Sequence, residues 1–117
     1  MARLSTHVLD TSRGVPAVGV RIEVHVLNGD TRKSVADAIT NRDGRTEAPL
    51  LSGDRLDAGI YEITFHAGDY FRRAGITLPD PPFLDRVVVR VGIADPAGNY
   101  HVPLLVAPYG YSTYRGS

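Results

Sequence analysis

The stretch VGVRIEVHVL, residues Val18–Leu27, decides how the rest of this sequence is interpreted. Its apolar side chains recur at every second position, with polar side chains between them. The first set is Val18, Val20, Ile22, Val24 and Val26, and the second is Arg21, Glu23 and His25. A period of two places the two sets on opposite faces of a strand. The stretch therefore predicts a β-strand with one buried and one polar face.

The same alternation recurs along the chain. Ile60–Ala67 turns Tyr61, Ile63 and Phe65 inward, and Asp85–Ile93 carries valines on alternate positions. Shorter strands are expected at Leu4–Leu9, Ser34–Thr40 and Arg45–Ala48, the last following the turn NRDG (41–44). A second turn, DPAGN (95–99), predicts a hairpin into YHVPLLVAPYG (100–110). One short helix is expected near Asp69–Gly75. Seven or eight short strands separated by Gly/Pro turns predict an all-β, antiparallel sandwich.

Length and composition exclude several classes of protein. The 117 residues fit one domain, residues 1–117, and Lys+Arg balance Asp+Glu at 13 each. Zero net charge argues against a duplex nucleic-acid partner, which requires a clustered basic surface. The absence of cysteine excludes disulfides and thiolate metal ligands. No window has the length of a signal peptide core or a membrane span, so we expect a cytoplasmic protein with no membrane partner.

The strand expected at residues 100–107 is apolar on both faces. Tyr100, Val102, Leu104 and Val106 form one face, and Pro103, Leu105 and Ala107 lie opposite. A sandwich buries only one face of each sheet, so an apolar second face predicts a further covering layer, most simply another subunit. His101 belongs to that second face. Because Pro103 cannot donate a ladder hydrogen bond, it requires an edge, a bulge or a gap.

Four histidines are the main candidates for chemistry. His25 and His66 fall on polar strand faces and are expected to be solvated surface residues. His7 and His101 lie in different surroundings, although the residues alone leave a structural role open for both. No serine-hydrolase elbow, P-loop or HExxH motif occurs. Two histidines without a carboxylate cluster make a weak zinc site, because catalytic zinc usually has three protein ligands.

Three segments carry a resemblance to a known family. LSTHVLDTSRGVPAVGV begins at Leu4, TNRDGRT lies around Gly44, and YHVPLLVAPYGYSTYRGS ends at Ser117. They resemble the transthyretin-related family and, within it, the 5-hydroxyisourate hydrolase branch. The terminal Tyr-Arg-Gly-Ser is the most specific element of this resemblance. Val15 and the tripeptide 106–108 depart from the usual family pattern without affecting the matching histidines.

The resemblance implies a transthyretin-like sandwich of about eight strands and a homotetramer built as a dimer of dimers. It also implies hydrolysis of 5-hydroxyisourate to 2-oxo-4-hydroxy-4-carboxy-5-ureidoimidazoline in urate catabolism, with no cofactor and no metal. The family's site carries over to two groups of residues. His7, Arg45, His101 and Ser117 would be catalytic, and Tyr111, Tyr114, Arg115 and Gly116 would contact the substrate.

Elementary chemistry supports such a site. Histidine titrates near pH ~6.5, so one imidazole could take a proton from water while the other orients the water or protonates the departing nitrogen. Which of His7 and His101 does which stays open. Arg45 would stabilise developing negative charge, and the Ser117 hydroxyl and terminal carboxylate would orient a histidine or the water. Two alternatives remain: a transthyretin-like carrier without turnover, and a zinc hydrolase.

Overall fold

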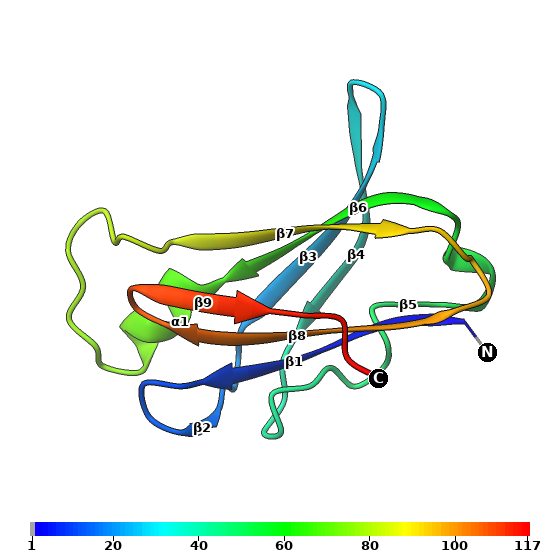
Figure 1. Ribbon diagram of the computed structural model, residues 1–117. Helices are drawn as coiled ribbons and strands as arrows, with labels where there is room; N and C mark the ends of the chain where they lie inside the picture. Colours follow the sequence, from blue (N-terminus) through cyan, green and yellow to red (C-terminus); the bar gives the residue numbers. More distant parts are fainter. Residues whose placement is uncertain (1) are drawn as a thin grey trace.

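The computed structural model describes residues 2–117, and these form two β-sheets packed face to face (Figure 1). The first sheet has the order β2-β1-β8-β9, with β5 paired to the end of β1; the second has the order β4-β3-β6-β7. The first sheet comprises β1 (Arg3–Asp10), β2 (Val15–Pro16), β5 (Leu51–Ser52), β8 (Asn99–Ala107) and β9 (Gly110–Thr113). The second comprises β3 (Arg21–Asn28), β4 (Thr31–Ile39), β6 (Gly59–His66) and β7 (Arg86–Ile93).

The core lies between the two sheets and is filled by the alternating apolar side chains. β1 alternates between buried and half-buried residues along its length, and β7 buries Val87, Val89 and Ile93. Phe65 of β6 and Phe71 of α1 (Ala67–Arg73) are fully buried. Each such side chain contributes roughly 1.5–3 kcal/mol through its removal from water. The expected all-β sandwich with one short α-helix is therefore confirmed.

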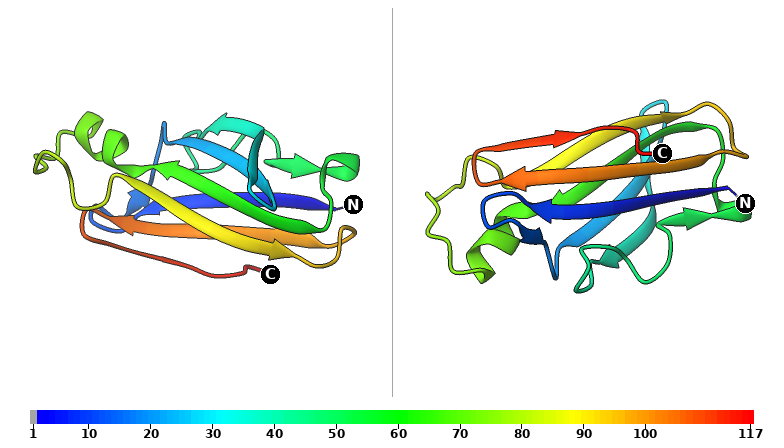
Figure 2. Two further views of the ribbon diagram at one scale, coloured as in Figure 1. Left: turned by 90° about the horizontal axis from the view of Figure 1, so that it is seen from above. Right: turned by 60° about the horizontal axis from the view of Figure 1, so that its bottom comes forward.

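The first sheet is mixed, because β1 and β8 run parallel over their whole length. Their register pairs Arg3 with Asn99 and continues to Asp10 and Val106. Figure 2 shows β8 between β1 and the C-terminal segment. Two strands whose register partners are 96 positions apart in the sequence thus lie side by side, and their outer faces are continuous.

Two predicted elements were wrong. The turn at 95–99 does not close a hairpin, because β7 and β8 belong to different sheets and the turn carries the chain from one sheet to the other. The true hairpin joins β8 to β9. Residues 45–48 form irregular loop instead of a strand, and the next strand is β5. The side chains of Arg45, Thr46 and Glu47 line a cavity instead.

The burial of three residues on β3, on β6 or beside them differs from what the alternation predicts. Val18 is 50% exposed because it lies in a turn before β3 begins. His66 was expected at the surface but is buried. β6 ends directly in α1, so Glu23 of β3 and Asp69 of α1 flank the two ring nitrogens of His66. His25 is half-buried, with its Nδ1 lacking a hydrogen-bond partner among the described residues.

Within residues 2–117, none of the helices is both long enough and apolar enough to cross a bilayer.

Candidate active site

The outer face of the β1–β8 pair carries the histidines that the sequence singled out. Ser5 and His7 are half-buried on β1, while Leu4, Thr6 and Val8 point into the core. Ser5 is the register partner of His101 on β8, and His7 is the partner of Pro103. Paired residues on adjacent strands project from the same face of a sheet. Parallel pairing thus brings the N-terminal Ser5 and His7 next to the C-terminal His101.

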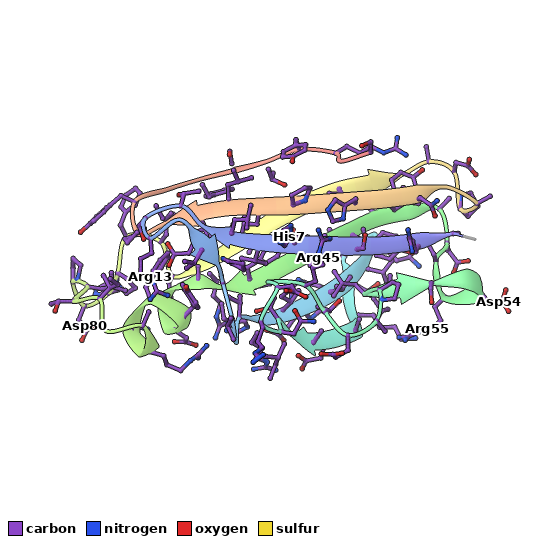
Figure 3. All side chains as sticks on the ribbon, turned by 90° about the horizontal axis from the view of Figure 1, so that it is seen from below. His7, Arg13, Arg45, Asp54, Arg55 and Asp80 are labelled. Carbon is purple, nitrogen blue, oxygen red and sulfur yellow. The ribbon has the colours of Figure 1, made fainter. Side chains whose placement is uncertain are left out.

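A tight loop at 41–45 brings Arg45 to the same face. The side-chain oxygen of Asn41 accepts hydrogen bonds from the backbone amides of Asp43 (2.9 Å) and Arg45 (3.2 Å). Such bonds form an Asx turn, which closes the loop locally. Gly44 then docks the loop on β1, because its carbonyl accepts a 2.8 Å hydrogen bond from the Val8 amide. Figure 3 shows the labelled His7 and Arg45 in the same region of β1.

The loop also fixes the tautomer of His7. Its Nε2 lies 2.8 Å from the backbone carbonyl oxygen of Asp43. A carbonyl oxygen only accepts, so Nε2 carries the hydrogen that it donates. When the ring is neutral, Nδ1 of His7 therefore carries the lone pair.

The imidazole of His101 is held on two sides. Its Nδ1 lies 2.9 Å from the hydroxyl oxygen of Ser5. On the opposite flank is Gly116, where a Cβ atom would lie only 2.7 Å from His101 Cδ2. The Gly116 amide also donates a 2.7 Å hydrogen bond to the His101 carbonyl. With these two ring edges occupied, Nε2 is the nitrogen left to face outward.

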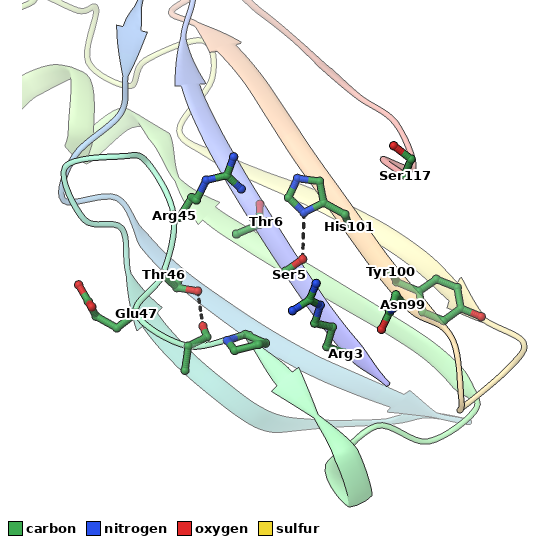
Figure 4. Close-up of a pocket in the computed structure, with 12 residues that line it drawn as sticks. Arg3, Ser5, Thr6, Arg45, Thr46, Glu47, Asn99, Tyr100, His101 and Ser117 are labelled. Atoms are coloured by element: carbon green, nitrogen blue, oxygen red, sulfur yellow. Dashed lines mark hydrogen bonds between the residues drawn. The ribbon is translucent and has the colours of Figure 1, made fainter. Parts of the chain in front are cut away.

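Ser5, Arg45 and His101 line a cavity of about 630 Å³ (Figure 4), whereas His7 lies on the same face of β1 but is not among the lining residues. Its walls come from the start of β1, the loop 45–49, the start of β8 and the C-terminal residue. In Figure 4 the Arg45 side chain points toward the His101 ring, with Ser117 on the far side of that ring. The lining residues are Arg3, Ser5, Thr6, Arg45, Thr46, Glu47, Ala48, Pro49, Asn99, Tyr100, His101 and Ser117.

Burial lowers the pKa of His101 below its usual value, and the positive charge of Arg45 lowers it further. His7 and Arg3 act in the same direction with smaller effects. Both burial and nearby cations disfavour the charged imidazolium. His101 is therefore neutral near pH 7 and available to accept a proton.

The C-terminal segment reaches this cavity because of a gap in the sheet. The β8–β9 ladder ends at Leu104 and Thr113, and Pro103, which has no amide hydrogen, comes next. The Pro103 carbonyl is instead satisfied by the Thr113 hydroxyl at 2.7 Å. The chain then rejoins β8 at the His101–Gly116 bridge. The gap is one of the three arrangements that Pro103 required.

Not all predicted site residues lie at this cavity. Ser117 lines it and Gly116 packs on His101, whereas Tyr111 and Tyr114 are exposed, at 46% and 59%. Tyr114 and Arg115 line a different cleft, over β7. There Arg115 covers the ring of Tyr100 and donates to the Asn99 carbonyl. Within one chain, these three residues do not reach the histidines.

Ser5 and Arg3 are among the cavity residues that the sequence interpretation did not single out. Ser5 and Arg3 share the outer face of β1 with His7, at spacings of two and four, and this period was the available signal. Their pairing with the start of β8 depends on the parallel register, which no local pattern specifies. Across the part of the chain that the structure describes, no three His, Asp or Glu side chains gather as a metal site would require.

The fold and this cavity together define a transthyretin-like sandwich that carries a histidine–arginine site on the outer face of one sheet. Residues 4–116 match the family model described as the HIUase/Transthyretin family, and the chain belongs to that family.

Specific relatives support the assignment. The chain is 57% identical to 5-hydroxyisourate hydrolase 2 of Rhizobium meliloti, over 98% of this chain and 96% of that protein. The structure of Klebsiella pneumoniae 5-hydroxyisourate hydrolase superposes with a TM-score of 0.82 at 38% identity, and the match covers 100% of both chains. Sea bream transthyretin, crystallised with thyroxine, gives a TM-score of 0.86 at 27% identity, covering 97% of this chain and 94% of that one.

Proposed function

We propose that this protein is a 5-hydroxyisourate hydrolase of urate catabolism, which yields 2-oxo-4-hydroxy-4-carboxy-5-ureidoimidazoline. The observation that carries the proposal is the placement of His101 and Arg45 in one cavity, with Ser117 at its wall. These residues belong to a chain that is 57% identical to a protein named 5-hydroxyisourate hydrolase 2. Residues 1–117 would act as one domain, with no cofactor and no metal.

The reaction opens the six-membered ring by hydrolysis. The oxygen of a water molecule bonds to a ring carbonyl carbon, the adjacent carbon–nitrogen bond breaks, and the departing nitrogen gains a proton. A neutral histidine removes the proton from the attacking water, and an imidazolium returns one to the nitrogen. His101 suits the first task because its lowered pKa keeps it neutral. His7, hydrogen-bonded through Nε2, keeps Nδ1 for orienting water or for the second proton transfer.

Arg45 would stabilise the negative charge that develops on the carbonyl oxygen during attack. Its guanidinium stays charged at all relevant pH values and offers a planar set of donors. It is positioned by the docked loop 41–45 before substrate arrives, so little reorganisation is needed. One well-placed donor of this kind is worth about 3 kcal/mol of transition-state stabilisation.

The C-terminus completes the proposed site. Ser117 lines the cavity. There its hydroxyl and terminal carboxylate would orient the water or a histidine. Tyr111, Tyr114 and Arg115 would contact substrate only where another subunit brings them to the cavity. Deleting residues 114–117 is expected to abolish turnover while leaving a folded oligomer, measured by substrate decay and by circular dichroism.

The oligomer in this proposal is a homotetramer, a dimer of dimers. Support comes from the outer face of β8, where Leu105 and Ala107 are half-buried and share the face of His101. A second subunit over this face would shield the cavity and strengthen its electrostatics. Light scattering after size-exclusion chromatography tests the mass of the oligomer.

The cytoplasmic location stays part of the proposal and is tested by fractionating cells that produce the untagged chain.

The rival function is a transthyretin-like small-molecule carrier without turnover, which the likeness to a thyroxine-bound transthyretin favours. Freshly prepared 5-hydroxyisourate, followed by its ultraviolet decay, separates the two. We expect the protein to accelerate the decay strongly over buffer. Decay at the buffer rate would support the carrier.

A chelator in a parallel assay tests the alternative of a zinc hydrolase. We expect unchanged turnover, and loss of activity would favour zinc.

A further inference from the structure

Among the described residues, the hydroxyl of Ser5 is the side-chain group found within hydrogen-bond distance of a ring nitrogen of His101. Ser5 and His101 are register partners on parallel strands, and the 2.9 Å separation of Oγ from Nδ1 fixes the direction of that ring edge. Gly116 occupies the opposite edge, at Cδ2. The imidazole therefore presents Nε2 to the cavity, and its function depends on whether Nε2 carries a hydrogen or a lone pair.

A hydroxyl can stabilise either state. If Ser5 donates to Nδ1, the neutral ring has its hydrogen on Nε2 and cannot accept a proton from water. If Ser5 accepts from Nδ1–H, the Nε2 lone pair faces the cavity. In the second arrangement Nδ1 keeps its hydrogen in both the neutral ring and the imidazolium, so one hydrogen bond persists through a full catalytic cycle.

We propose that Ser5 is a positioning residue that accepts the Nδ1 hydrogen of His101 and thereby holds the tautomer in which Nε2 is the base. This inference rests on the proposed hydrolase function and extends it, because it assigns the water-activating nitrogen. In this role Ser5 acts through His101 and not directly on the reacting atoms.

A neutral oxygen beside Nδ1 of His101 also affects the pKa of that ring. A carboxylate would favour the imidazolium and raise the pKa of His101, whereas a hydroxyl orients the ring without adding a negative charge.

With opposite tautomers, the two histidines would offer different ring nitrogens to the reaction. His7 donates from Nε2 to a backbone carbonyl and keeps its lone pair on Nδ1. His101 would donate from Nδ1 and keep its lone pair on Nε2. Each ring then has one nitrogen committed to the protein and one left for chemistry, as second-sphere hydrogen bonds commonly arrange.

The direct test is nitrogen NMR of the substrate-free protein labelled with 15N-histidine, with His101→Asn used to assign the His101 signals. Above the pKa, we expect Nδ1 of His101 to give the shift of a protonated ring nitrogen and Nε2 that of an unprotonated one. Ser5→Ala should move the population toward the Nε2–H form, and Ser5→Thr should restore it. Ser34→Ala, an exposed serine on β4, is the matched control and should change nothing.

Turnover gives a second, separate readout. Ser5→Ala should lower kcat about tenfold, the worth of one hydrogen bond, with KM little changed. A protonated Nε2 in the wild-type protein, or a tautomer ratio unaffected by Ser5→Ala, would overturn the inference even if the enzyme is active. Conversely, the expected tautomer in a protein that fails to accelerate substrate decay would remove the proposed function and leave the Ser5–His101 geometry intact.

Discussion

The backbone amide of Gly116 donates a 2.7 Å hydrogen bond to the carbonyl oxygen of His101, and the glycine lies flat against the imidazole edge. This contact joins the end of the chain to the proposed base. It also leaves no room for a side chain, since a Cβ atom at residue 116 would lie 2.7 Å from Cδ2.

Gly116→Ala should therefore displace the His101 ring or the chain end. A shift of about 1 Å in a catalytic group can cost roughly a hundredfold in rate, and we expect a loss of that order in kcat. Gly110→Ala is the matched control, because a Cβ atom there meets nothing within 4 Å. Equal activity of the two variants in the substrate-decay assay would show that the contact does not position the ring.

Gly44 is needed for two reasons that can be separated experimentally. Its φ of +75° disfavours other residues, and a Cβ atom would lie 2.3 Å from the Val8 carbonyl oxygen. Gly29 has a φ of +61° but open space around it. Gly29→Ala should cost about 1–2 kcal/mol in the free energy of unfolding, from backbone strain alone. Gly44→Ala should cost roughly 3 kcal/mol or more and should lower turnover, because the loop that places Arg45 must move off β1. Denaturant unfolding with parallel activity assays measures both, and similar costs at the two sites would contradict the docking.

The pH dependence of kcat/KM tests the electrostatics of the cavity. Burial and the charge of Arg45 both lower the pKa of His101, so activity should extend to lower pH than with an unperturbed histidine and be lost as pH falls through that lowered pKa. Arg45→Gln removes one cause, so the acid limb should move to higher pH while the plateau falls. Arg32→Gln, on β4 and paired with Glu62, should leave the limb in place. An acid limb that stays fixed in Arg45→Gln would show that His101 is not the group titrating.

A buried polar network at the far end of β1 stabilises the fold. Asp10 is 1% exposed and accepts hydrogen bonds from Ser12, from the Arg13 guanidinium and from Tyr70. Burial alone would raise the pKa of Asp10, but these hydrogen bonds together lower it below its usual value. The stabilisation of the fold by ionised Asp10 is thus present above the unfolded-state pKa and is lost as pH falls through the lower folded-state pKa.

Tyr70→Phe should reduce the free energy of unfolding at pH 7 by about 1–2 kcal/mol, because one hydrogen bond to Asp10 is lost. The exposed Tyr109→Phe should stay within about 0.5 kcal/mol of wild type, and an equally small change in Tyr70→Phe would contradict the network.

Much of the fold could be predicted because alternation reports burial. The inward residues of β6 and β7 and the outer position of His7 all follow from a period of two. Pairing could not be predicted in this way. The hairpin expected at 95–99 was wrong because a Gly/Pro turn does not show whether the chain folds back within a sheet or crosses to another.

The site shows the same limit. His7 and His101 were recognisable as unusual, and the family resemblance added Arg45 and the chain end. Ser5 was missed because its importance depends on the parallel register with His101, a contact between positions 96 residues apart. His66 was misassigned because the helix that covers it follows immediately in the sequence, where strand periodicity no longer applies.

One comparison bears most directly on the proposed chemistry: the initial rate of 5-hydroxyisourate decay with wild-type protein and with His101→Asn at equal concentration. Asparagine keeps a polar group near the position of Nδ1 but cannot take a proton from water. We expect strong acceleration by the wild type and a rate at least about a hundredfold lower in the variant, with the same thermal stability. Comparable rates from the two proteins would mean that His101 does not activate the water, and the cavity would need a different catalytic base.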